Sequence, residues 1–119
     1  FKAFLSNRQA DATHFHSVHY TFWHQLDDID KLEAWANVSA PVLVLYGKAD
    51  YAASQEDHPL IRDAVNESHA GNATYIELDG IGHGFETAAS QLETQQNRLS
   101  GEFNPVIIDT TVEWMRELS

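Results

Sequence analysis

Two short runs of the sequence have the character of β-strands, and a helical pattern separates them. VLVLYG at 42–47 is apolar at successive positions, with proline before it and glycine at its end, and ATYIELD at 73–79 follows later. Strands that are apolar on both faces are typical of parallel sheets covered by helices. Between the two runs, apolar positions recur along one helical stripe, which predicts a helix over 57–70. This order predicts a βαβ unit with parallel strands.

Amphipathic spacing predicts three more helices around these strands. Their expected ranges are 28–37, 86–100 and 105–118. The last helix has an apolar stripe, expected to be buried, that consists of Ile108, Val112 and Met115. The fold class is therefore α/β.

The two strands are few for a sheet of this kind. A parallel pair that is covered on both faces normally has neighbouring strands, and the sequence does not supply them. We therefore expect residues 27–119 to be part of a larger α/β domain. Residues 1–26 are polar and aromatic with four histidines, and we expect a loop with short helical pieces.

Composition and charge exclude several classes of partner. The chain has 119 residues, 43% of them hydrophobic, and a formal net charge of −11 from 18 acidic and 7 basic side chains. Nucleic acids and anionic membranes bind basic surfaces, so neither is expected as a partner. The absence of cysteine excludes disulfides and thiolate metal sites. The longest apolar run, APVLVLY, is too short to cross a bilayer and no signal peptide is recognisable, so we expect a soluble protein of open localisation.

Both predicted strands end near a residue that can carry acid–base chemistry. Asp50 lies three residues after Gly47 in GKAD, and His83 lies three residues after Gly80 in GIGHGF. The carboxyl ends of parallel strands meet at one edge of a sheet, where open α/β folds bind ligands. A carboxylate there can orient an imidazole, fix its tautomer and stabilise its protonated form. We expect Asp50 and His83 to be a catalytic pair. The alternative is that Asp50 is a turn residue or helix cap and His83 a surface loop histidine.

These motifs resemble the end of an α/β-hydrolase domain. PVLVLYGKAD, then a helix and YIELDGIGHGF, is similar to the last two strands of that fold, with the acid in a G-x-x-D turn and the histidine in a small-residue loop. Together with FWHQLDDIDKLEAWANVSAP, the chain looks like a bacterial subgroup of serine esterase and acylaminoacyl-peptidase-like hydrolases over about residues 20–118. The resemblance implies that Asp50 is the acid and His83 the general base of a catalytic triad. It also implies that residues 27–119 are a C-terminal α/β-hydrolase-like half-domain and that residues 1–26 are a cap or lid-like segment.

The nucleophile of that family has no counterpart in this sequence. In α/β-hydrolases a serine in G-x-S-x-G precedes the acid and the histidine. The sequence contains neither this motif nor a cysteine, and it begins at Phe1. We therefore expect a processed chain or a piece of a longer protein that is inactive alone. Completed by an N-terminal half, it would hydrolyse a small ester or amide by acyl transfer, without a cofactor.

A second class of function stays open from the sequence. The chain would then be a stand-alone remnant that has lost the reaction and serves as a binding or self-associating module. The sheet edge without a neighbouring strand would favour a homodimer.

The segment HFHSVH raises the question of a metal site. On a strand His14 and His16 share a face, whereas on a helix His16 and His19 do. No single regular element presents all three, and only Asp11 offers a nearby carboxylate. We expect a polar segment over the cleft and assign no metal ligand, and these histidines and His24 have no assigned role.

Overall fold

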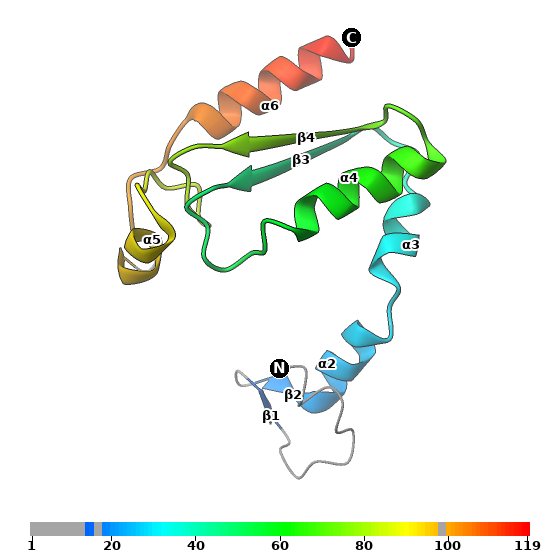
Figure 1. Cartoon of the computed structure of the whole chain (residues 1–119), viewed down its shortest axis with the longest axis horizontal. Coiled ribbons are helices and arrows are strands. Elements are labelled where there is room, and N and C mark those ends of the chain that lie inside the picture. The colour runs from blue at the N-terminus through cyan, green and yellow to red at the C-terminus, as the bar shows by residue number, and fades with distance from the viewer. Residues whose placement is uncertain (1–13, 16–17, 98–99) are drawn as a thin grey trace.

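Two parallel strands form the centre of the protein. In the computed structural model β3 spans Val42–Gly47 and β4 spans Ala73–Leu78. The residues pair in register from one end to the other, Val42 with Ala73 and Gly47 with Leu78. Both strands therefore end at the same edge of the sheet (Figure 1). The predicted α/β arrangement, with two parallel strands in one sheet, is confirmed.

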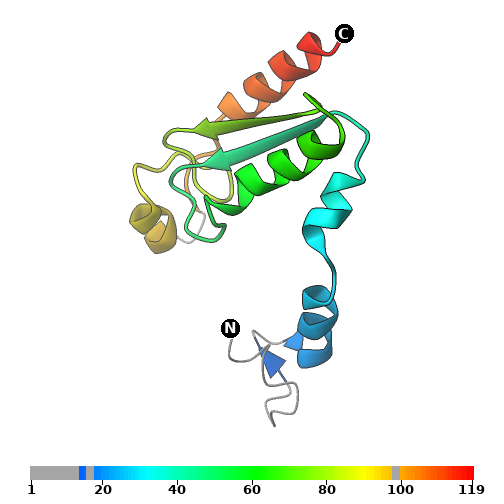
Figure 2. The same ribbon diagram turned by 45° about the vertical axis from the view of Figure 1, so that its right-hand side comes forward.

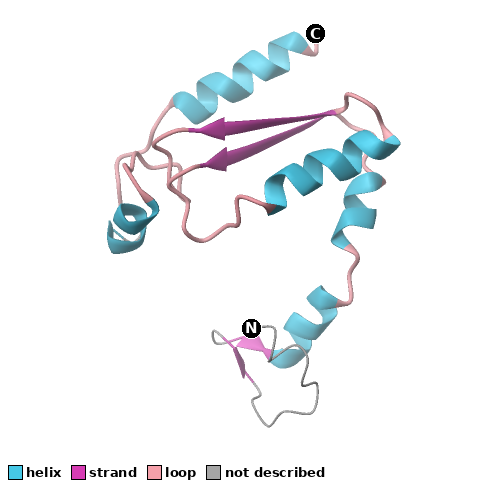
Figure 3. Cartoon of the chain, in the orientation of Figure 1, coloured by secondary structure: helices cyan, strands magenta, loops and turns pink. Residues whose placement is uncertain are grey.

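The structure describes residues 14–15, 18–97 and 100–119, and this part of the chain also contains helices. They are α2 (Tyr20–Asp27), α3 (Lys31–Ala36), α4 (Asp57–Ser68), α5 (Gln91–Asn97) and α6 (Val106–Glu117). The short strand β1 (His14–Phe15) pairs antiparallel with β2 (Val18–His19). In Figure 3 the chain runs from β3 through α4 to β4, and then through α5 and α6 to the C-terminus. The helices α3, α4 and α6 lie within the ranges predicted for them.

The crossover helix α4 is fixed to the sheet by packing and by one polar side chain. Val65 is fully buried, with 0% exposure, between the helix and the strands. Asn66 bonds both backbone groups of Ala73, accepting from its N–H at 2.8 Å and donating to its carbonyl at 2.9 Å. These bonds tie α4 to the first residue of β4. Figures 1 and 2 show α4 and α6 on opposite sides of the strand pair.

The predicted apolar stripe of α6 is not buried, which corrects the sequence analysis. Ile107 is the buried residue of this helix and packs with Leu78 and Ile81. The three residues of the predicted stripe are exposed. They are Ile108, Val112 and Met115. A two-stranded sheet is too narrow to cover the whole apolar side of this helix, so only its first turn reaches the core.

The helix predicted over 86–100 is also shorter than expected, because α5 begins only at Gln91. Before it, the backbone N–H groups bond distant carbonyls and not the preceding turn. Thr87 donates to Glu102 at 2.8 Å and Ala88 donates to Gly80 at 3.0 Å. Such bonds replace the i to i−4 pattern of a helix. Residues 98–99 lie outside the described part.

The N-terminal elements lie apart from the sheet in both views (Figures 1 and 2). The radius of gyration is 17.1 Å, whereas a compact domain of this length has roughly 13–14 Å. Residues 1–13 and 16–17 fall outside the described ranges, and the cap or lid role of 1–26 stays a prediction. None of the helices described is long and apolar enough to pass through a bilayer.

Truncating the buried valine of α4 tests this packing. We expect Val65→Ala to lower the free energy of unfolding by roughly 2 kcal/mol, because it leaves a cavity in a fully buried place. The matched control is Val112→Ala on α6, where the side chain is 38% exposed, and its effect should stay within about 0.5 kcal/mol. Urea unfolding measures both. Equal losses for the two variants would contradict the packing described.

Candidate functional site

The strand pairing continues past the ends of the strands and fixes the loops that follow them. Lys48 N–H donates to the Leu78 carbonyl at 2.9 Å, and Ala49 N–H donates to the Ile81 carbonyl at 2.9 Å. The loops approach so closely at Gly47 that a Cβ there would lie 2.3 Å from the Ile81 oxygen. The two segments that carry the predicted acid and histidine are therefore held together by their backbones.

The carboxylate of Asp50 is oriented by a turn of its own backbone. Its Oδ1 accepts hydrogen bonds from the N–H groups of Ala52 at 2.7 Å and Ala53 at 3.1 Å. Aspartate commonly bonds the backbone in this way at the start of a turn. The second oxygen, Oδ2, is left to face His83, and the side chain as a whole is only 9% exposed.

His83 meets this carboxylate through one ring nitrogen. The distance from its Nδ1 to Asp50 Oδ2 is 2.9 Å. An ionised carboxylate only accepts hydrogen bonds, so the contact assigns a proton to Nδ1 and leaves Nε2 as an acceptor in the neutral ring. The His83 side chain is 45% exposed. The structure thus brings together the two predicted site residues, with the acid buried and the base accessible.

The pKa of Asp50 reflects two opposed influences. Burial is the largest single one, and it would raise the pKa of this carboxyl. The hydrogen bond from His83 and those from the backbone N–H groups of Ala53 and Ala52 act in the other direction. Together they hold the pKa of Asp50 below its ordinary value of 3.8. Asp50 is therefore ionised at neutral pH, the form that can orient an imidazole and stabilise its protonated state.

An exposed ion pair also links the ends of the two strands. Lys48, directly after β3, lies 2.8 Å from Asp79, directly after β4, and 3.9 Å from Glu77. The hydrogen bond to Asp79 raises the pKa of Lys48 above its usual value. Because these groups are in contact with solvent, the pair adds little to stability and supports the backbone pairing only weakly.

Glu86 is a residue of this site that the sequence analysis missed. Its backbone carbonyl accepts from Gly82 N–H at 2.9 Å, and its carboxylate accepts from Gly84 N–H at 2.7 Å. It therefore contacts the residues on both sides of His83. The feature that could have indicated it is an acidic residue three positions after His83. The polar helix predicted over 86–100 included Glu86 and gave it no role in the site.

The histidine-rich segment is only partly described. His14 and His19 are partners across β1 and β2, and His16 lies outside the described residues. The Nδ1 of His19 accepts from the backbone N–H of Thr21 and caps α2, in which His24 is buried. Within residues 14–15, 18–97 and 100–119, no group of three His, Cys, Asp or Glu could hold a metal ion. The preference for a polar segment over a metal site stays a prediction.

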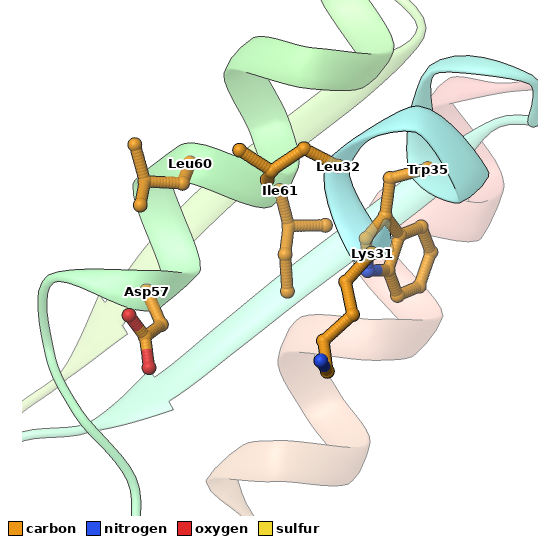
Figure 4. Close-up of a pocket in the computed structure, with 6 residues that line it drawn as sticks. All are labelled: Lys31, Leu32, Trp35, Asp57, Leu60 and Ile61. Carbon is orange, nitrogen blue, oxygen red and sulfur yellow. The ribbon is translucent and has the colours of Figure 1, made fainter. Parts of the chain in front are cut away.

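A separate hollow lies between α3 and α4 (Figure 4). It has a volume of about 290 Å³ and is mainly apolar, with one basic and one acidic side chain. Its lining consists of Lys31, Leu32, Trp35, Asp57, Leu60 and Ile61. Neither Asp50 nor His83 lines it, so it is not a substrate cleft for this pair. Trp35 lines the hollow from α3.

The chain matches no protein-family model, no curated protein and no solved structure.

The pH dependence of stability tests the environment of Asp50. A folded pKa below the unfolded value means that the carboxylate contributes stability above about pH 4, and that this contribution is lost as the pH falls through the folded pKa. We expect the difference in unfolding free energy between the wild type and Asp50→Asn to be larger at about pH 6 than at about pH 3. Denaturant titrations at both pH values measure it.

The matched control for this test is Asp63→Asn, which removes a carboxylate whose side chain is 60% exposed. Its effect should be small at both pH values, as for other exposed ion pairs. An Asp50→Asn difference that is equally large at both pH values would contradict the assignment of Asp50 as a carboxylate stabilised by folding.

Proposed function

We propose that this chain carries the acid and the general base of a serine α/β-hydrolase, which cleaves an ester or an amide by acyl transfer. The observation that supports the proposal is the 2.9 Å contact from His83 Nδ1 to Asp50 Oδ2 at the shared end of two parallel strands. A buried, ionised acid holds one side of the ring, and the ring remains accessible to a nucleophile. Acid and histidine follow one another along the chain in the order of the α/β-hydrolases.

The chemistry follows from this orientation of the ring. A serine hydroxyl attacks the carbonyl carbon of the substrate, its proton moves to Nε2 of His83, and the carbonyl oxygen takes up the negative charge. Asp50 stabilises the imidazolium that forms. The ring then gives the proton to the leaving alcohol or amine as its bond to carbon breaks. Water, deprotonated by the same nitrogen, then attacks the acyl carbon. The bond from this carbon to the serine oxygen breaks, the ring returns the proton to that oxygen, and the acid is released.

In this proposal the serine and the oxyanion donors belong to polypeptide outside these 119 residues, because the sequence has no G-x-S-x-G. Two features support a further part of the fold. Within the described residues, β3 and β4 each pair only with the other, so each has an open edge. The apolar residues on α6 that were predicted to be buried are exposed. Further strands and helices would cover both.

Hydrolysis of a short-chain p-nitrophenyl ester tests the proposal. The chain alone should show no turnover above that of its His83→Ala variant. Produced together with the polypeptide encoded directly upstream, it should gain activity that falls about 10³- to 10⁴-fold in His83→Ala and in Asp50→Asn, the scale of loss for triad members. His69→Ala, which removes a histidine near the opposite ends of the strands, is the matched control. Turnover that survives in His83→Ala would contradict the proposal.

The alternative is a self-associating module without a reaction, and the open edges of β3 and β4 are the observation that favours it. An unpaired strand edge can bind the same edge of a second copy. This alternative predicts a stable dimer at micromolar concentration in sedimentation experiments and no ester turnover with the upstream polypeptide. A monomer over the whole concentration range would count against it.

A further inference from the structure

The N–H groups of the two residues that flank His83 both bond to one residue. Gly82 N–H donates to the backbone carbonyl of Glu86 at 2.9 Å, and Gly84 N–H donates to its Oε2 at 2.7 Å. The first bond fixes the chain just before His83 and the second fixes it just after. Glu86 therefore determines the path of the backbone from which the imidazole projects toward Asp50.

The burial of this carboxylate is unusual for a residue that only fills space. Glu86 is 2% exposed, and within the described residues its Oε1 has no hydrogen-bond partner. A buried acid with one unpartnered oxygen is costly, so its presence calls for an explanation. The neighbours leave room for it, since a Cβ at Gly82 would lie 2.2 Å from Oε1 and one at Gly101 would lie 2.8 Å from its Cβ.

The backbone beside His83 is also held in a strained conformation. Phe85 has a φ of 61°, in the left-handed region that side chains rarely adopt. Its N–H donates to the Gly82 carbonyl at 3.1 Å, and its own carbonyl accepts from Asn104 N–H at 2.8 Å. Strained residues persist where surrounding bonds over-determine them, which happens often at functional sites. The loop that carries His83 is thus a closed turn with fixed ends.

We propose that Glu86 is a positioning residue for His83, whose carboxylate and backbone carbonyl together set the direction of the ring toward Asp50. The importance of this positioning for catalysis rests on the proposed function, whereas the positioning itself is a property of this chain. The competing explanation is that Glu86 only fills the space beside Gly82 and Gly101. The two explanations differ in what a substitution does to the Asp50–His83 contact.

Two variants of nearly equal size separate these explanations. Glu86→Gln keeps an acceptor for Gly84 N–H, whereas Glu86→Met keeps the length and the apolar part of the side chain but has no comparable acceptor. We expect hydrogen exchange at the Gly84 amide to quicken about tenfold in Glu86→Met, as for the loss of one hydrogen bond. The Gln variant should exchange as the wild type does.

The decisive readout is the energetic coupling between Asp50 and His83. It is obtained from a double-mutant cycle of Asp50→Asn and His83→Ala, measured by denaturant unfolding of the full chain in each Glu86 background. Positioning predicts that the coupling persists with Gln and is lost with Met. If Glu86→Met does not fold, Glu86→Asp, which draws the carboxylate back by one methylene, replaces it under the same criterion.

Two results would overturn the role of Glu86. One is a Met or Asp variant that is less stable but keeps the full coupling, because Glu86 would then only pack. The other is no coupling in the unsubstituted chain, which would remove the contact that Glu86 is proposed to position. A third result is that Glu86→Met loses the coupling, but the chain produced with its upstream polypeptide shows no ester turnover that depends on His83. This result would support the positioning role of Glu86 and reject only the proposed function.

Discussion

The strands β3 and β4 pair in parallel in a single register, and this register determines where the candidate site lies. Gly47 pairs with Leu78 at the end of the ladder, and the next backbone bonds join Lys48 to Leu78 and Ala49 to Ile81. Side chains alternate between faces along a strand, so a shift by one residue would reverse every side chain of one strand relative to the sheet. Asp50 is reached from this ladder by a tight turn, in which its N–H bonds the Gly47 carbonyl.

At this edge of the sheet, Asp50 and His83 lie in different environments. Asp50 is buried, anchored by two backbone N–H groups and ionised, while His83 lies on a turn that leaves its ring accessible. A pair in which the acid is fixed and the base is accessible is suited to move a proton to and from a third group. The apolar positions left exposed on α6 and the open strand edges fit the proposal that this third group belongs to a larger assembly of the same fold.

The sequence was sufficient for the features that depend on local pattern. Apolar runs predict the two strands and the crossover helix, and residues just after the strand ends predict that Asp50 meets His83. The structure has all of these features.

The burial of α6 was predicted wrongly, because periodicity shows which face of a helix is apolar but not how wide a sheet covers that face. The start of α5 was wrong because backbone bonds to Gly80 and Glu102 override a weak helical pattern. Glu86 was missed because it is buried by the folding of the loop around His83, which the local sequence pattern does not show.

The most direct test of the Asp50–His83 contact is the tautomer of the His83 ring, read from its two nitrogen-15 signals at alkaline pH, where the ring is neutral. Asp50→Asn provides the reference without the carboxylate. The contact predicts a proton on Nδ1 and an unprotonated Nε2 in the wild type, and a change of this distribution in Asp50→Asn. A proton on Nε2 with an unprotonated Nδ1, or the same distribution in both proteins, would contradict the pairing of acid and base at this edge.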